Sequence, residues 1–249
     1  MSPRSADGDW VSGFDPKLSG GQGGRDYFAE CNSWTYTWSV QHDVAGLIEL
    51  MGGRDKVEQR LDQLFVEQYD VSKFHFLGQF PDSTGLIGQF VTGNEPSFHI
   101  PYLYNFVGAP WKTQRRIRDI MKIWFDDTPL GICGDEDGGA MSAWHVFNSI
   151  GIFPVCPGEP SYAIGSPVFE SIVIDLGDGK TFTIRADNSN TQNKYIQSAT
   201  LNGKYHNKPW IDHSAIGVGG ELVLEMGPRP NKEWGNEIGD APPSMSSHK

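Results

Sequence analysis

The spacing of the apolar residues changes part-way along the chain, and this change limits the folds that the chain can adopt. Over residues 57–65 they recur every three or four positions, which is typical of one face of an amphipathic helix. Over residues 160–228 they alternate with polar residues, which predicts antiparallel β-strands. A helical part followed by a β part favours an α+β fold, and we place its two domains at residues 1–153 and 154–249.

Local signals predict individual elements within these two parts. Gly52-Gly53 is a typical helix end, and Asp178-Gly179 is a typical hairpin turn. Helices are expected at residues 33–50, 57–65, 99–107, 111–125 and 142–150, and loops at residues 1–26, 72–98 and 126–140.

Helices joined by long loops suit a toroid of helical hairpins, so we expect the helical part to belong to an (α/α)6 barrel. A closed barrel of twelve helices needs well over ~150 residues, given helices of ~11–12 residues and their connections. Residues 1–151 hold only about half of such a barrel. We therefore expect a missing N-terminal part of the same polypeptide to be a partner of this chain.

The composition excludes some classes of function. The formal net charge is −11 and the sequence has no basic stripe, so nucleic acid is not an expected partner. No apolar run reaches the ~18 residues of a membrane span, and no signal peptide is visible. The three cysteines form no CxxC pair, which argues against a zinc site.

The most distinctive candidate site is an acidic loop flanked by glycines, in which Asp135, Glu136 and Asp137 follow one another. Three adjacent carboxylates repel unless solvent, a cation or hydrogen-bond donors compensate their charge. A predicted helix follows, and its N-terminus favours negative charge, so a solvated turn that caps this helix is an equal alternative. An EF-hand fits worse, because the positions of its Glu and Gly hold Val146 and Ala140.

Two further segments carry candidate groups. Glu30 stands beside Asn32 and a cluster of aromatic residues, which suits a general acid, although a Glu at a helix entrance is the plainer interpretation. Asn94 and Glu95 offer the hard oxygen ligands that calcium prefers, but they are also typical of a helix start. A single histidine such as His99 is more often a buried structural residue than a catalyst.

A pair of carboxyl groups on different loops can hydrolyse a glycosidic bond. One group protonates the leaving oxygen and the other activates water, and an inverting enzyme holds them about 6.5–9.5 Å apart. Glu30 and the acidic loop lie on different predicted loops, which allows such a gap.

Seven long segments carry a family resemblance: ADGDWVSGFDP, AECNSWTYTWSVQHDV, GLIELMGG, GNEPSFHIPYLYNFVGAPWKTQ, GICGDEDGGAMSAWHVFNSIGIFPVCPG, YAIGSPVFE and IQSATLNG. Together they resemble glycoside hydrolase family 92, the calcium-dependent exo-α-mannosidases, over nearly the whole chain. The resemblance implies an (α/α)6 barrel with a small β-structured C-terminal region. It also implies an N-terminal β-sandwich, which these residues do not contain.

The resemblance implies catalytic roles residue by residue. Glu30 matches the general acid of the family. Asp135 and Asp137 match the pair that holds and deprotonates the attacking water, so that the anomeric configuration is inverted. These assignments require the side chains at 30 and at 135 and 137 to face each other across a pocket.

The resemblance also implies a calcium ion that contacts the hydroxyls of the sugar. A hard cation prefers adjacent oxygen atoms, and distortion of the ring brings it nearer an oxocarbenium-like transition state. The implied Ca²⁺ ligands are Asn94, Glu95 and Asp137. The expected substrate-binding residues are Trp34, His99 and Glu136.

Three positions depart from the family pattern. Cys31 replaces a common Gly, Thr35 replaces a common Gln, and Phe98 replaces the first of two histidines, which leaves His99. The expected function is the removal of terminal α-linked mannose from N-glycans or yeast-type mannan, in an extracellular or periplasmic location. The alternative is a non-catalytic, carbohydrate-binding or inactive remnant of such an enzyme.

Overall fold

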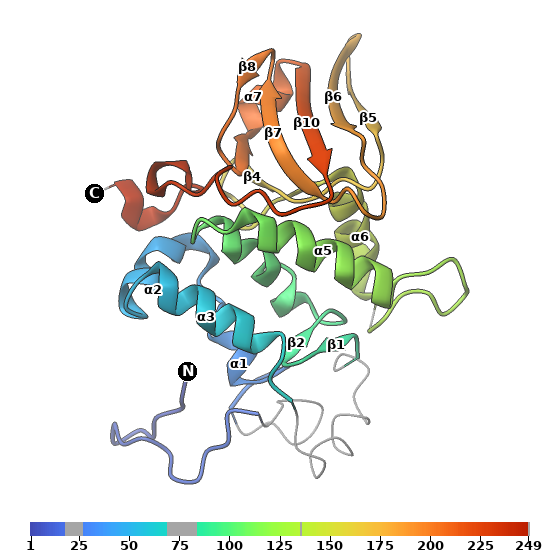
Figure 1. Ribbon diagram of the computed structural model, residues 1–249. Helices are drawn as coiled ribbons and strands as arrows, with labels where there is room; N and C mark the ends of the chain where they lie inside the picture. Colours follow the sequence, from blue (N-terminus) through green and yellow to red (C-terminus); the bar gives the residue numbers. More distant parts are fainter. Residues whose placement is uncertain (18–26, 69–83, 135, 249) are drawn as a thin grey trace.

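The computed structural model of the protein describes residues 1–17, 27–68, 84–134 and 136–248. The helices form one layer, and the larger sheets lie against it at the top of the view in Figure 1. The observed order of helices and then strands confirms the α+β class. The prediction that the helices belong to a barrel stays a prediction, as does the domain boundary at residue 153.

The helical layer is built from short and medium-length segments. It comprises α1 (Ser33–Tyr36), η1 (Gln41–Asp43), α2 (Val44–Leu50), α3 (Arg54–Leu64), η3 (Glu95–Ser97), η4 (Ile100–Asn105), α5 (Pro110–Trp124), η5 (Asp137–Gly139) and α6 (Ala140–Ile150). The stripes that predicted α3 and α5 are buried, as at Leu61, Ile117 and Ile120. Gly52 and Gly53 adopt positive φ values after α2, and Gly151 does so after α6.

One continuous helix over residues 33–50 is a wrong prediction. The chain leaves helical geometry at Val40, which has φ −132° and ψ 47°. Asp43 then starts α2 by accepting a hydrogen bond from the amide of Gly46 at 3.1 Å. A capping side chain and a β-branched residue therefore divide the segment, because both compete with a continuous helical hydrogen-bond ladder.

The strands form three sheets. A small hairpin joins β1 (Leu86–Ile87) to β2 (Phe90–Val91), within a segment that was expected to be a loop. Residues 72–83 of that expected loop lie outside the described residues. A three-stranded sheet has the order β3 (Ile152–Phe153), β4 (Ser161–Ile164), β9 (Trp210–Asp212). The largest sheet has the order β5 (Ser171–Gly177), β6 (Lys180–Asp187), β10 (Gly220–Gly227), β7 (Tyr195–Leu201), β8 (Lys204–Tyr205).

The prediction of an antiparallel region is correct except for one pair. The β5–β6 hairpin turns at Asp178 and Gly179, both with positive φ, as its sequence predicted. β10 runs antiparallel to β7 but parallel to β6. The chain makes β7, β8, β9 and the short helix α7 (His213–Gly217) before β10, and it then enters the gap between β6 and β7.

Buried polar side chains tie the two layers together. The Asn105 amide donates to the carbonyl oxygens of Ile164 and Pro209, at 3.0 and 2.9 Å. The amide nitrogen of Ile196 in β7 donates to the side-chain oxygen of Gln114 in α5, at 3.0 Å. Because these groups are buried, each hydrogen bond fixes the position of a strand relative to a helix.

One carboxylate ties the C-terminal tail to the start of α2. Asp43 accepts hydrogen bonds from the Ser246 amide at 3.0 Å and from the Ser244 hydroxyl at 2.9 Å, besides the bond from Gly46. The Ser246 hydroxyl also donates to it. These donors, the Ser246 hydroxyl foremost, hold the pKa of Asp43 well below its ordinary value.

We expect the substitution Asp43→Asn to release this tail, because the amide loses one acceptor oxygen and the negative charge. The depressed pKa means that the contribution of Asp43 to stability is complete above pH about 4, the ordinary range of Asp, and falls as the pH drops below it. Limited proteolysis measures the release of the tail. Thermal unfolding at pH 7 and pH 3 measures the contribution of Asp43 to stability. The exposed Asp7→Asn variant is the control. Equal tail cleavage in both variants at pH 7 would contradict the assignment.

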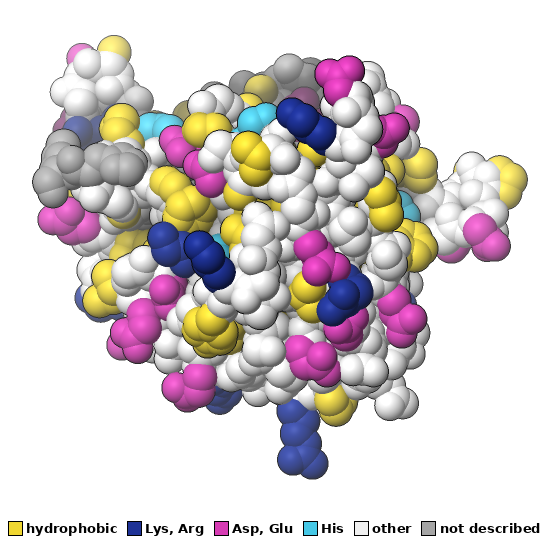
Figure 2. All heavy atoms as spheres, turned by 90° about the horizontal axis from the view of Figure 1, so that it is seen from above, with side chains coloured by type: hydrophobic (Ala, Val, Ile, Leu, Met, Phe, Trp, Pro, Cys, Tyr) yellow, Lys and Arg dark blue, Asp and Glu magenta, His cyan; other side chains and the backbone are white. Residues whose placement is uncertain are grey.

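The distribution of charged side chains on the surface is consistent with the negative net charge of the chain. On the face seen in Figure 2, acidic, basic and apolar side chains are interspersed, and the described residues form no wide basic area there. Among the described residues, none of the three cysteines, Cys31, Cys133 and Cys156, forms a disulfide. Of the helices within the described ranges, none combines the length and the apolar character needed to cross a membrane.

Candidate functional site

Glu30 is held by the loop that contains Asn94. The side-chain amide of Asn94 donates to Oε2 of Glu30 at 3.3 Å. Its carbonyl oxygen accepts a hydrogen bond from the thiol of Cys31 at 2.9 Å. Asn94 is buried and Glu30 is half-buried, so the carboxyl group is partly open to solvent while its partner is fixed inside.

The loop of Asn94 also contacts the acidic loop, through two glycines. A Cβ atom on Gly134 would lie 2.2 Å from the carbonyl oxygen of Gly93, and one on Gly93 would lie 2.7 Å from the Cα of Gly134. The Gly134 amide donates to the Thr84 hydroxyl at 2.7 Å. Such a close approach of two backbones requires glycine at both positions. It places Gly134, the described residue at the start of the acidic loop, next to the loop that holds Glu30.

The acidic loop itself has mixed roles. Asp135 lies outside the described residues. Glu136 is exposed, and both of its carboxylate oxygens accept from the Ser142 amide, at 3.2 and 3.0 Å, so it caps the N-terminus of α6. This is the alternative that the sequence left open. Asp137 is exposed at the start of η5, where it is free to meet solvent or a ligand.

Two expected substrate residues are buried. Trp34 is 5% exposed, and the Arg60 guanidinium carbon lies 3.4 Å from its ring centroid. His99 is 3% exposed, its Nε2 donates to the Trp38 carbonyl at 2.7 Å, and its Nδ1 accepts from Gln41 at 3.3 Å. Burial lowers the pKa of His99 to about 4, so the ring is neutral near pH 7. These contacts favour structural roles, and substrate binding by either residue stays a prediction.

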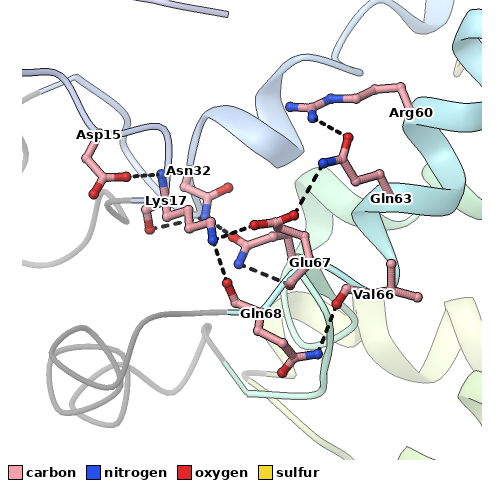
Figure 3. A network of polar contacts seen from close by, with 9 residues as sticks. Asp15, Lys17, Asn32, Arg60, Gln63, Val66, Glu67 and Gln68 are labelled. Carbon is pink, nitrogen blue, oxygen red and sulfur yellow. Dashed lines mark hydrogen bonds and ion pairs between the residues drawn. The ribbon is translucent and has the colours of Figure 1, made fainter.

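A polar network fixes the segment that carries Glu30. Figure 3 shows Lys17 reaching Glu67 and the carbonyl of Gln68, in the segment that follows α3; the contact with Gln68 is 2.7 Å long. Asn32 lies in the same network. Its oxygen accepts from the amides of Trp34 and Thr35 and so caps α1. Asn32, two positions after Glu30, is therefore held both by α1 and by the network around Lys17.

The donors around Asn94 have the chemistry of a hard-cation site, although their cluster is incomplete here. The part of the chain that the structure describes, which leaves out Asp135, contains no group of three or more His, Cys, Asp or Glu placed to hold a metal. Glu95 is half-buried and Asp137 exposed, and both offer carboxylate oxygens. The Asn94 carbonyl oxygen is occupied by the Cys31 thiol, so Asn94 must rearrange to ligate a cation.

The part of the chain that contains Glu30 and the acidic loop matches the model of a known catalytic domain. The family model described as the glycosyl hydrolase family 92 catalytic domain matches residues 1–228. The chain belongs to glycosyl hydrolase family 92. The family that the sequence resembled is thereby confirmed.

Members of family 92 share this fold. A GH92 α-mannosidase of Bacteroides thetaiotaomicron, solved with mannoimidazole, is 36% identical and has a TM-score of 0.89 over 98% of this chain and 32% of its own. A GH92 inverting mannosidase of the same organism is 38% identical, with a TM-score of 0.84 over 99% of this chain and 33% of its own.

A curated relative from another organism is also similar to this chain. An uncharacterized secreted glycosidase of Arthroderma benhamiae is 38% identical over 221 residues, which are 88% of this chain and 26% of the relative. The chain spans about a quarter to a third of the length of these family 92 relatives.

Sequence reasoning missed some residues of the site. The contact between Gly93 and Gly134 was not predicted, although each glycine begins a motif that was singled out. Tyr36 was noted only as an aromatic neighbour. Burial foremost, and then the nearby acidic groups of Cys31 and Glu30, raise the pKa of Tyr36, which indicates that its hydroxyl faces this pair. Spacing alone cannot reveal such a contact across a loop.

Proposed function

We propose that this chain supplies catalytic residues of a glycosidase that removes terminal α-linked mannose from glycans with inversion. The observation that carries the proposal is the joint placement of Glu30 and the acidic loop. Asn94 holds Glu30, and the residue before Asn94 contacts the residue before Asp135. Mannose is the proposed sugar because the matched structures are GH92 α-mannosidases.

In the proposed reaction, Glu30 protonates the glycosidic oxygen as the bond to the anomeric carbon breaks. Asp135 and Asp137 hold a water molecule on the opposite face and accept its proton as it attacks that carbon. This division of roles needs a gap of roughly 6.5–9.5 Å between the two carboxyl groups. The exposed position of Asp137 supports its access to water.

The test of the proposed function is turnover by the full polypeptide. A mannobiose and 4-nitrophenyl α-mannoside are the substrates, and NMR of the first sugar released from mannobiose reports its anomeric configuration. β-Mannose as the initial product supports inversion. Tight mannose binding without turnover of either substrate would instead support a non-catalytic carbohydrate-binding protein.

We further propose Ca²⁺ as the cofactor, with Glu95, Asp137 and, after rotation of its amide, Asn94 as ligands. Their carboxylate and amide oxygens are the donors that a hard cation prefers. When bound, the ion would supply positive charge next to the sugar hydroxyls. The protein's own part is to hold these donors on adjacent loops, which the Gly93–Gly134 contact supports.

Removal of calcium is expected to lower kcat/KM by at least ~10-fold, a typical scale for disturbing a metal site. The measurement compares enzyme treated with EDTA with the same sample after Ca²⁺ is restored, and Mg²⁺ is the control ion because it demands a tighter octahedral geometry. Full activity after complete removal of Ca²⁺ would reject the metal role.

We propose an extracellular location, with periplasmic as the bacterial equivalent, because the Arthroderma benhamiae relative is a secreted glycosidase. We also propose N-glycans or mannan as natural substrates and an N-terminal part of the same polypeptide as the partner. The lengths of the relatives support such a partner, since this chain covers only 26–33% of them.

A further inference from the structure

A cavity of about 600 Å³ lies where α5 and α6 meet the loops of the β part. Arg118 and Lys122 of α5 line it, together with Phe169 from the loop after β4 and Lys194 just before β7. None of these residues is a proposed catalytic or calcium-binding residue. Of the described residues that line the cavity, none is an Asp or a Glu. The cavity is therefore basic, although the whole chain is strongly acidic.

Arg118 is half-buried, and carbonyl oxygens rather than a carboxylate hold it in place. Its Nη1 donates to the Pro167 carbonyl at 2.6 Å, and its Nη2 donates to the Asn190 carbonyl. Burial lowers the pKa of Arg118, but a guanidinium stays charged in proteins. It has five N–H donors, so these two bonds leave donors for a ligand. Because a buried charge without a counter-charge is costly, an anion in the cavity would stabilise Arg118.

A second positive charge lies one turn along the same helix. Lys122 comes four residues after Arg118, a spacing at which like charges on a helix face repel. Within the described ranges, neither of the two forms an ion pair, whereas Lys194 pairs with Asp119 at 3.1 Å. Arg118 and Lys122 therefore leave the cavity with two uncompensated positive charges. A phosphate monoester, with a charge of about −1.5 to −2 at pH 7, matches them.

The rest of the lining suits a sugar ring. Phe169 is 56% exposed, and Met121 and Val168 add further apolar surface. The apolar C–H faces of a sugar can pack against such side chains. Thr191 adds a hydroxyl that can donate to or accept from those of a sugar. Apolar walls with a few polar groups that fix orientation are typical of sites for small ligands.

We propose that this cavity is a second binding site, which takes a phosphorylated saccharide. Arg118 and Lys122 hold the phosphate, and the sugar ring packs on Phe169. The phosphate follows from the charges of the cavity, whereas the choice of mannose as the sugar rests on the proposed function. Such a site recruits the enzyme to glycans that carry phosphate, because neutral glycans lack the group that the two cations bind.

Calorimetric titration of the full polypeptide tests the site. The probe is mannose 6-phosphate, and inorganic phosphate and mannose are the comparisons. Mannose 6-phosphate is expected to bind roughly fivefold more tightly than inorganic phosphate, because its ring adds contacts. It is also expected to bind in excess mannose, which occupies the proposed catalytic site. Equal affinity for inorganic phosphate would mean an adventitious ion only, and loss of binding in mannose would place the ligand at the catalytic site. Either result overturns the proposal.

Four variants assign the contacts. Arg118→Lys keeps the charge but loses the planar fork, so mannose 6-phosphate should bind about 10-fold more weakly. Lys122→Gln should weaken it about threefold, the scale of one exposed charge. Phe169→Ala should weaken mannose 6-phosphate about fivefold and leave inorganic phosphate unchanged. Lys204→Gln, at an exposed residue of β8 that does not line the cavity, is the matched control.

Two of these variants keep the test valid if Arg118→Lys disturbs the loops that Arg118 holds. Lys122 and Phe169 are exposed, so their substitution should leave the fold intact, which thermal unfolding checks. Wild-type affinity for mannose 6-phosphate in both Lys122→Gln and Phe169→Ala would overturn the proposal.

Failure of this inference is distinguishable from failure of the proposed function, because binding and turnover are measured separately. A full polypeptide that cleaves mannobiose but does not bind mannose 6-phosphate refutes the second site alone. An acidic segment of the same polypeptide that fills the cavity would give this result. Binding that depends on Lys122 and Phe169, in a protein that cleaves no mannoside, refutes the proposed function alone.

Discussion

Glu30→Gln is expected to lower kcat on mannobiose by at least ~100-fold, the usual scale for losing a general acid. The amide is almost the same size as the carboxyl group, and its oxygen can still accept from Asn94, so the local structure is expected to persist. What disappears is the proton that the leaving sugar needs. The expected loss is therefore in kcat and much less in KM, because the substrate contacts remain.

The leaving group of the substrate provides the sharpest check on the role of Glu30. The loss on 4-nitrophenyl α-mannoside should be much smaller than on mannobiose, since nitrophenolate needs little protonation. Glu49→Gln is the matched control. It makes the same chemical change at an exposed residue at the end of α2, away from the site. Equal rates for Glu30→Gln and Glu49→Gln would reject Glu30 as the acid.

The substitution Gly134→Ala is expected to damage both stability and activity. The new Cβ would lie 2.2 Å from the Gly93 carbonyl oxygen, and Gly134 has a φ of +73°. A left-handed conformation costs a non-glycine residue roughly 1–2 kcal/mol, and forced overpacking costs about 1–3 kcal/mol more. The total of about 2–5 kcal/mol is a large part of an ordinary domain's stability of about 5–15 kcal/mol.

Two control variants separate these costs. Gly158 has a φ of +97° with no atom within 4 Å of a built Cβ, so Gly158→Ala tests the conformational cost alone. Gly93 has no positive φ, and its Cβ would lie 2.7 Å from the Gly134 Cα, so Gly93→Ala tests the close contact alone. Denaturant unfolding measures each cost. If Gly134→Ala destabilises the protein no more than Gly158→Ala, the close packing of the two loops is wrong.

Gly134→Ala is also expected to lower kcat at least ~10-fold in molecules that remain folded. The clash pushes the acidic loop away from the loop of Asn94, and a displacement of about 1 Å between catalytic groups can cost about 100-fold. Activity measured well below the unfolding temperature tests this. Gly158→Ala should leave kcat unchanged, because it alters a loop that none of the proposed catalytic residues belongs to.

The sequence predicted the parts of the fold that depend on local pattern. The apolar stripes of α3 and α5 follow helical spacing, and the Asp178-Gly179 turn requires positive φ values that these residue types favour. The division between α1 and α2 was missed, because the capping by Asp43 outweighs a pattern that otherwise continues. The parallel pairing of β6 with β10 depends on the path of the intervening chain, which alternation cannot reveal.

For the candidate site too, some features could be predicted from the sequence and others could not. The motifs around Glu30, Asn94 and the acidic loop were recognisable as segments, and the matched family supports them. Their contacts were not predictable, because Gly93 and Gly134 are far apart in sequence and glycine has no side chain to indicate a partner. The exchange of glycine for Cys31 was visible in the sequence, but its positive φ and its contact with Asn94 were not.

The position of β10 has a consequence for how the β part can form. The strand that comes last in the chain lies in the middle of the five-stranded sheet, between β6 and β7. Until a ribosome has released residues 220–227, the earlier strands can exist only as two separate hairpins, β5–β6 and β7–β8, each with an open edge. Those edges are the kind that join neighbouring chains. The nascent protein is therefore most prone to aggregate while these hairpins are exposed and residues 220–227 have not yet emerged.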